Sequence, residues 1–266
     1  MALKEPVFPP RLLDCYRKLE KIELPAAVVA LDGAAVASWD GKSPLLESAP
    51  PLIDPDRFIA VAQQVFDLLA AHLPEMEKDL QCLGKKLPAG TAARAGLVHA
   101  LISRDARAVT FMQDYGEIAP DVFGFAFSHV LRIFLGAYAR RLQAEVDFAR
   151  WGRGSCPVCG SKPIFSRLDR TGRRFLYCGL CGTEWRFVRA ACPFCGNTAP
   201  EKLGFYLFEK GVYRVYVCNG CRGYLKTLDE RAADHAVPNL FWEDIKTVPL
   251  DMTVLRLGFV NKSFAI

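Results

Sequence analysis

Three cysteine-rich stretches decide the fold: residues 156–163 read CPVCGSKP, residues 174–197 read RFLYCGLCGTEWRFVRAACPFCGN, and residues 217–229 read VCNGCRGYLKTLD. They contain eight of the ten cysteines, arranged as four Cys-x-x-Cys pairs. Eighteen residues separate the first two pairs and 22 separate the last two. Two such turns across a short hairpin supply four sulfurs at tetrahedral positions around a metal ion. The pattern therefore predicts two metal sites, the first formed by Cys156, Cys159, Cys178 and Cys181 and the second by Cys192, Cys195, Cys218 and Cys221.

The two groups of four cysteines repeat one local pattern. CPVCGS, a hairpin and CGLCGTEW are followed by CPFCGN, a second hairpin and CNGCRGYL. We expect the hairpin strands at 164–168 and 173–178 in the first unit, and at 205–208 and 212–218 in the second. Because the pattern repeats in sequence order, each site is expected to use two successive pairs rather than to combine the first pair with the third. Folding units of about 40 residues are seldom stable without a cross-link such as a disulfide or a bound metal ion. Zinc binding contributes on the order of 10–16 kcal/mol to the folding free energy of such a unit.

A glycine follows the second cysteine in three of the four pairs, at Gly160, Gly182 and Gly196. A left-handed backbone at these positions lets amide groups turn toward the sulfurs. The fourth pair departs from the pattern, because Arg222 follows Cys221 and glycine comes one position later.

The first 150 residues are predicted to be helical. Asp54 is a good N-cap with Pro55 at the first helical position, and apolar residues then recur every three or four positions up to Pro74. The remaining expectations for this region are a longer amphipathic helix over about 121–149, shorter helices at 11–22, 91–103 and 104–115, and a loop at 32–55.

The predicted fold class is a multidomain α+β protein. A helical domain (1–150) is followed by two tandem rubredoxin-like or zinc-ribbon β modules (151–190 and 191–230), and a C-terminal tail (231–266) is expected to pack back on the body. The composition, with 51% hydrophobic and 24% charged residues, excludes a disordered chain.

The most apolar stretches, 24–37 and 122–137, are interrupted by charged or polar residues, so no membrane insertion is expected. The N-terminal MALKEPVFPP lacks the apolar run of a signal peptide, which predicts a cytoplasmic protein. In that reducing compartment a high cysteine content indicates metal or redox chemistry rather than disulfides.

Residues 151–226 contain 13 Lys and Arg against four Asp and Glu, a net charge of +9. This charge and the aromatic residues between Phe205 and Tyr216 leave a nucleic-acid-binding zinc ribbon as an alternative. Specific nucleic-acid binding is not expected, since four thiolates on a divalent ion carry a formal charge of −2 that the basic residues offset.

A thiol redox protein is a less favoured alternative, because none of the pairs follows a strand at a helix N-terminus. Cys15 and Cys82 are expected to be small core residues, and the four histidines are scattered. The sequence contains no catalytic motif. We therefore expect neither enzymatic activity nor a small-molecule substrate.

The cysteine-rich stretches resemble the bacterial formate dehydrogenase accessory proteins, which are maturation factors of molybdenum-dependent formate dehydrogenases. The resemblance covers Cys156 to Asp229 and includes Thr183-Glu184-Trp185, Val188-Arg189 and Tyr224-Leu225-Lys226; it is weaker around Phe8–Tyr16, in the helical part and in the tail (Asp244, Leu250 and Asp251). It implies a cytoplasmic, non-enzymatic protein that binds the catalytic subunit of formate dehydrogenase before export. It also implies rubredoxin-type iron, with zinc as the alternative, because a tetrahedral four-sulfur site suits both metals.

A surface for this partner is predicted around Glu184, Trp185 and Arg189, in and after a strand of the first module. Tryptophan and arginine often dominate protein interfaces. The competing interpretation for Trp185 is that it covers the metal cluster as part of a small hydrophobic core.

Overall fold

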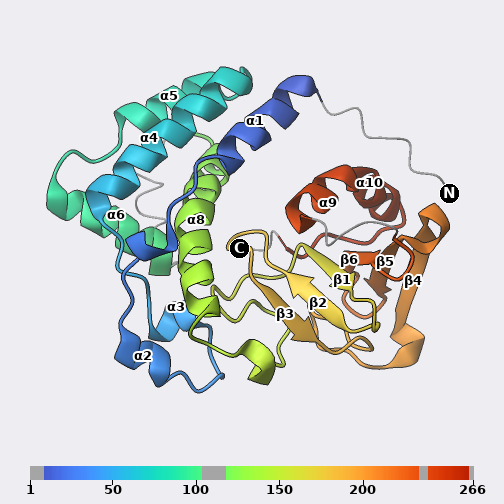
Figure 1. Cartoon of the computed structure of the whole chain (residues 1–266). Coiled ribbons are helices and arrows are strands. Elements are labelled where there is room, and N and C mark those ends of the chain that lie inside the picture. The colour runs from blue at the N-terminus through green and yellow to red at the C-terminus, as the bar shows by residue number, and fades with distance from the viewer. Residues whose placement is uncertain (1–8, 104–117, 234–238, 264–266) are drawn as a thin grey trace. The chain divides into compact units, whose positions relative to one another are not determined.

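The computed structural model describes residues 9–103, 118–233 and 239–263 (Figure 1). The chain divides into two compact units. One unit comprises Phe8–Trp39 and Leu45–Val146, and the other includes Asp40–Pro44 and Asp147–Ile266. The predicted fold class is confirmed, since a helical unit precedes β modules that carry two groups of four cysteines.

The first unit is helical within its described residues, with α1 (Pro10–Glu20), α2 (Gly33–Ala37), α3 (Leu45–Ser48), α4 (Pro55–His72), α5 (Glu77–Lys85), α6 (Thr91–Ser103) and α8 (Pro120–Gln143). Helix α4 begins as predicted, because the Asp54 side chain accepts hydrogen bonds from the backbone amides of Asp56 and Arg57. Helices α4 and α8 pack through aromatic pairs. The Phe58 and Phe134 ring centroids lie 5.0 Å apart, and those of Phe66 and Phe127 lie 5.2 Å apart.

The structure corrects several helix predictions. The segment 32–55 is not only a loop, because Asp32 caps α2 and α3 follows. The helix predicted over 121–149 ends at Gln143, and a single 3₁₀ turn follows at Phe148–Arg150. Helix α5 was not predicted, and the helix predicted at 104–115 lies largely outside the described residues.

Helix α8 is long and apolar enough to cross a membrane by length and composition, and it alone passes this test within the described ranges. Its most apolar window is 61% buried inside the protein. Such burial is typical of a core helix, and the aromatic contacts with α4 agree with that role.

The second unit contains a six-stranded sheet in the order β3-β2-β1-β6-β5-β4. The strands are β1 (Phe165–Leu168), β2 (Arg174–Tyr177), β3 (Glu184–Phe187), β4 (Leu203–Phe208), β5 (Tyr213–Cys218) and β6 (Tyr224–Asp229). Each module contributes an antiparallel three-stranded piece. Parallel pairing of β1 with β6 joins the pieces, so the two predicted modules share one sheet.

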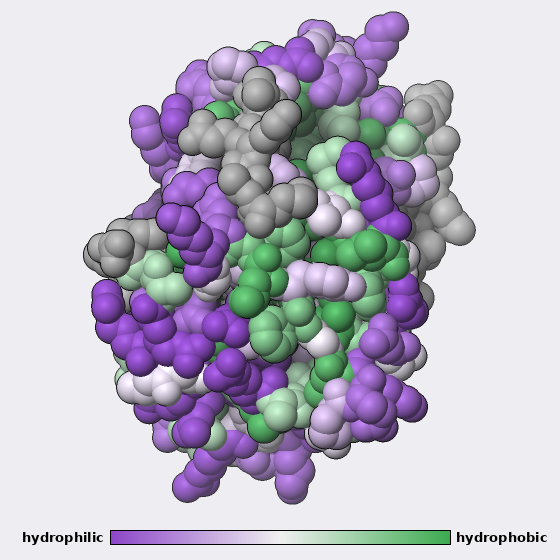
Figure 2. All heavy atoms as spheres, turned by 90° about the vertical axis from the view of Figure 1, so that its right-hand side faces the viewer, coloured by the Kyte–Doolittle hydropathy of each residue, from purple (hydrophilic) through white to green (hydrophobic). Residues whose placement is uncertain are grey.

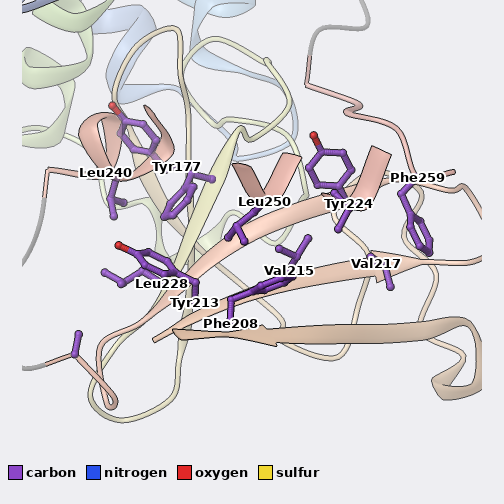
Figure 3. Packing of buried hydrophobic residues seen from close by; sticks show 13 residues of the cluster. Tyr177, Phe208, Tyr213, Val215, Val217, Tyr224, Leu228, Leu240, Leu250 and Phe259 are labelled. Carbon is purple, nitrogen blue, oxygen red and sulfur yellow. The ribbon is translucent and has the colours of Figure 1, made fainter. Parts of the chain in front are cut away.

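Two C-terminal helices, α9 (Leu240–Lys246) and α10 (Val248–Arg256), pack on this sheet. Leu250 and Val254 of α10 belong to a hydrophobic cluster with Phe165, Val215 and Leu228 (Figure 3). The buried Lys226 ammonium of β6 forms ion pairs with Asp244 at 2.8 Å and Asp251 at 2.6 Å, which ties both helices to the sheet.

Candidate metal centres

The first group of cysteines brings four buried sulfurs together at one end of the β1–β2–β3 piece. The Cys156 and Cys181 sulfurs are 3.5 Å apart, and those of Cys159 and Cys178 are 3.4 Å apart. A tetrahedral ion with metal–sulfur bonds of about 2.3 Å separates its ligand sulfurs by about 3.8 Å. These separations are near that value and far above the length of a disulfide bond, about 2.05 Å. The donor set therefore fits a tetrathiolate metal ion.

The second group has the same architecture. Its sulfurs approach to 3.7 Å between Cys192 and Cys221, and to 3.7 Å between Cys195 and Cys218. Within each group, all four sulfurs lie within 4.8 Å of one another, so two successive pairs converge, as the repeat predicts. Unlike the first group, this one is partly open, because Cys195 is exposed and Cys221 is half-buried.

Three of the four turns are held by the same backbone hydrogen bonds. In the first turn, the amide of Gly160 donates to the carbonyl of Cys156 at 2.9 Å, and the amide of Cys156 donates to the carbonyl of Ser161 at 2.8 Å. Gly160, Gly182 and Gly196 all have φ near +73° to +74°. This left-handed backbone explains the glycine after the second cysteine.

The fourth turn uses Arg222 at the equivalent position, with φ of +59°. A residue with a Cβ is strained in this region. The Arg222 guanidinium donates to the carbonyls of Leu257 at 2.8 Å and Gly258 at 3.2 Å, and it lies over the Phe259 ring. These contacts anchor the C-terminal segment to the second site.

The protonation of the sulfurs follows their surroundings. Burial, followed by the neighbouring thiols, raises the pKa of Cys156 well above its usual value. Burial also opposes ionisation of Cys218, but the backbone amides of Cys221 and Gly220 lower the pKa of that thiol to about 7. Metal binding requires thiolates and releases thiol protons, so an ion would replace the protons in both groups.

The three residues predicted to contact a partner are in different environments. Trp185 is 1% exposed, and its indole N–H donates to the carbonyl of Arg153 at 3.0 Å. Glu184 forms an ion pair with Arg167. Arg189 is exposed, and its Nε donates to the Tyr216 hydroxyl at 3.3 Å. Of the three residues, Arg189 thus offers the most accessible side chain.

Cys15, Cys82 and three of the four histidines lie in the helical unit, and His235 lies outside the described residues. Cys15 is buried and Cys82 is half-buried, and neither belongs to a group of metal-ligating residues in the described part of the chain. Burial, followed by the charge of Arg132, lowers the pKa of His129 to about 4. His129 therefore stays neutral at physiological pH.

Sequence patterns did not reveal Arg174, the first residue of β2. Its side chain is buried and lines a cavity of about 340 Å³ beside the second cysteine group, together with Cys192 and Cys218. Its Nε and Nη2 have no hydrogen-bond acceptor among the described residues. No local signal marks this arginine, because its surroundings come from segments distant in the sequence.

Residues 155–189 match the family model described as "FdhE, central domain". The chain is 36% identical over 149 residues to an FdhE homologue of Aquifex aeolicus, with 54% of this chain and 51% of that protein covered. It is 27% identical over 244 residues to an FdhE homologue of Pseudomonas aeruginosa, with 82% and 77% covered. A crystal structure of the FdhE protein from Pseudomonas aeruginosa matches 82% of each chain at 26% identity, with a TM-score of 0.46.

The matched region spans about half the length of the first two relatives, from Aquifex aeolicus and Haemophilus ducreyi. The matched segment 155–189 contains all four cysteines of the first group. The chain is related to the FdhE formate dehydrogenase accessory proteins, so the resemblance expected from its sequence is confirmed.

Proposed function

We propose that this relative of the FdhE proteins is a cytoplasmic, non-enzymatic maturation factor for formate dehydrogenase. It binds the catalytic subunit of that enzyme before export. The match of residues 155–189 to the FdhE central domain carries the proposal, because that segment forms the buried first cysteine group.

In this proposal, the eight cysteines of the two groups hold two metal ions, iron or zinc. A tetrathiolate ion supplies a covalent cross-link, and iron would add a one-electron redox couple. The surrounding residues position the sulfurs and join the two modules. Three glycine turns orient the sulfurs, the Trp185 hydrogen bond to Arg153 fixes the segment that enters the first turn, and the shared sheet holds the two modules in one register.

Partner binding is proposed to involve Arg189, whose side chain is exposed beside the second module. The combined change Glu184→Ala and Arg189→Ala should leave both metal ions bound and weaken capture of the catalytic subunit by about 2 kcal/mol. Since Glu184 is paired with Arg167, Glu184→Ala alone should have the smaller effect. If the double variant captures the catalytic subunit as well as the parent protein does, the docking surface does not include these residues.

The function is tested in a bacterium that lacks its own FdhE-type protein. The parent chain should restore formate dehydrogenase activity and co-purify with the catalytic subunit, whereas Cys178→Ser should do neither. Elemental analysis and the visible spectrum of protein purified without oxygen identify the metals. Normal formate dehydrogenase activity without any FdhE-type protein would contradict the proposal.

A further inference from the structure

The cavity beside the second cysteine group has an apolar wall with two charged side chains. The wall includes Pro193, Phe194, Leu203, Phe205, Val217 and Leu225, and the charges come from Arg174 and Arg189. An apolar pocket with a few convergent polar groups is the usual form of a binding site.

The buried Arg174 side chain is only partly hydrogen-bonded within the described residues. Its Nη1 donates to the carbonyl of Ala191 at 3.3 Å, and its guanidinium carbon lies 4.1 Å from the centroid of the Tyr216 ring. Nε and Nη2 remain without an acceptor in the part of the chain that the structure describes. These two N–H groups suit the two oxygens of a carboxylate, with which arginine forms paired hydrogen bonds.

Arg189 brings a second positive charge to the same place, because it also contacts Tyr216 and lines the cavity. The unpaired N–H groups of Arg174 are shielded from solvent. We therefore expect the Tyr216 ring, which stacks on the guanidinium, to shift when a carboxylate enters.

Strand β4 is an exposed edge that adjoins this cavity. It is the last strand of the sheet and pairs with β5 alone among the described strands. Its sequence, LGFYLF, has no charged residue, and Phe205, Tyr206 and Leu207 are 49%, 40% and 54% exposed. Proteins usually protect such an edge with charges, because it offers a template for another strand.

The edge and the cavity are continuous, since Leu203, Gly204 and Phe205 of β4 line the cavity. Figure 2 looks at the side of the molecule that carries β4 and α10, and it shows hydrophobic side chains gathered between hydrophilic ones. This arrangement suits a segment that pairs its backbone with β4 and places alternate side chains in pockets.

We propose that β4 and the adjoining cavity bind an extended, largely apolar segment of a partner polypeptide, and that this segment places a carboxylate against Arg174 and Arg189. In naming formate dehydrogenase as the partner, the inference rests on the proposed function. Because β4 contains no acidic residue, a second copy paired through this strand offers the arginines no carboxylate from it. A small organic acid alone would leave the apolar edge uncovered.

The experiment measures the affinity of the full-length, metal-loaded chain for the catalytic subunit of formate dehydrogenase. Leu207→Lys places a charge on the exposed edge, and Arg174→Met removes the guanidinium while keeping an apolar side chain. Both variants should weaken binding by about tenfold or more, with the metal content unchanged. Leu255→Lys is the matched control, because Leu255 is 49% exposed on α10.

A second probe separates this inference from the proposed function. A short synthetic peptide of valines with a single glutamate should bind the parent chain more tightly than the same peptide with glutamine at that position, and Arg174→Met should abolish the difference. If the peptide behaves this way and the catalytic subunit does not bind, the binding surface on β4 and the cavity is supported, and the proposed partner is wrong.

Three results would overturn the inference. In the first, Arg174→Met binds both probes as tightly as the parent chain. In the second, Leu207→Lys converts a dimer to a monomer without affecting either probe, which assigns the edge to self-association. In the third, Arg174→Met loses the second metal ion but keeps its partner, which makes Arg174 a counter-charge for the cluster.

Discussion

The two cysteine modules have the same ligand pattern and share one sheet, but they differ in exposure. All four sulfurs of the first group are buried, whereas the second group has an exposed Cys195 and a half-buried Cys221. The first site is therefore closed to solvent, and the second is partly open. The second lies beside a cavity and is in the same module as β4, the edge strand that pairs only with β5 among the described strands. The spacing of the cysteines thus determines which sulfurs meet, while the surrounding chain determines what can reach them.

The two modules also differ at one equivalent position of the repeat. Trp185 and Leu225 each stand four residues after the last cysteine of their module. Trp185 is buried and hydrogen-bonded to Arg153, whereas Leu225 lines the cavity. Leucine has the smaller side chain, and in the second module a cavity adjoins it.

The largest expected effect comes from removing a ligand of the closed site. Cys178→Ser should lose one metal ion and disorder the first module, because metal binding contributes on the order of 10–16 kcal/mol to a module of this kind. Elemental analysis measures the loss, and circular dichroism should show the helical unit retained. Cys82→Ser is the control, since Cys82 lies outside both groups. A full metal content in Cys178→Ser would show that this sulfur is not a ligand.

Replacing Trp185 or Leu225 by the residue at the equivalent position of the other module tests the role of this position. Trp185→Leu should destabilise the protein by about 3 kcal/mol, because it leaves a cavity and an unpaired carbonyl at Arg153. Leu225→Trp should cost less than about 3 kcal/mol, since the existing cavity accepts much of the ring. Denaturant unfolding of both variants measures the two costs. If Leu225→Trp costs more than Trp185→Leu, the cavity does not provide this space.

The open site should exchange its metal first. A chelator should remove the second ion at least about tenfold faster than the first, a difference of about 1.4 kcal/mol in activation free energy. Cys195 should be the first of the eight cysteines alkylated as metal is withdrawn, because it is the most exposed of these eight residues. Mass spectrometry of alkylated peptides identifies the order, and equal rates at the two sites would contradict this role of burial.

The smallest expected effect is at the fourth turn. Arg222→Gly gives this turn the residue found in the other three and relieves the left-handed strain at φ +59°, but it removes the contacts to Leu257 and Gly258. The net change in unfolding free energy should stay within about 1 kcal/mol, with faster proteolysis of the C-terminal segment. Arg222→Ala keeps the strain and loses the contacts, so it should be less stable than Arg222→Gly.

Local patterns predicted much of this molecule. The spacing of the Cys-x-x-Cys pairs predicted which four sulfurs converge, because each pair is formed by one turn and each group spans one hairpin. The capping residues Asp54 and Pro55 similarly predicted where α4 begins. Helix α5, whose N-cap Met76 makes no side-chain hydrogen bond, lacks such a signal and was missed.

By itself, the sequence determined the helical region, the two cysteine groups and the relationship to FdhE proteins, because these depend on residues close together in the chain. The tertiary structure alone decided the parallel pairing of β1 with β6, the burial of Arg174 with no acceptor for Nε and Nη2 among the described residues, and the cavity beside the edge strand β4. The reason is physical. Burial and hydrogen-bond satisfaction depend on which distant segments pack together, and no local spacing specifies that.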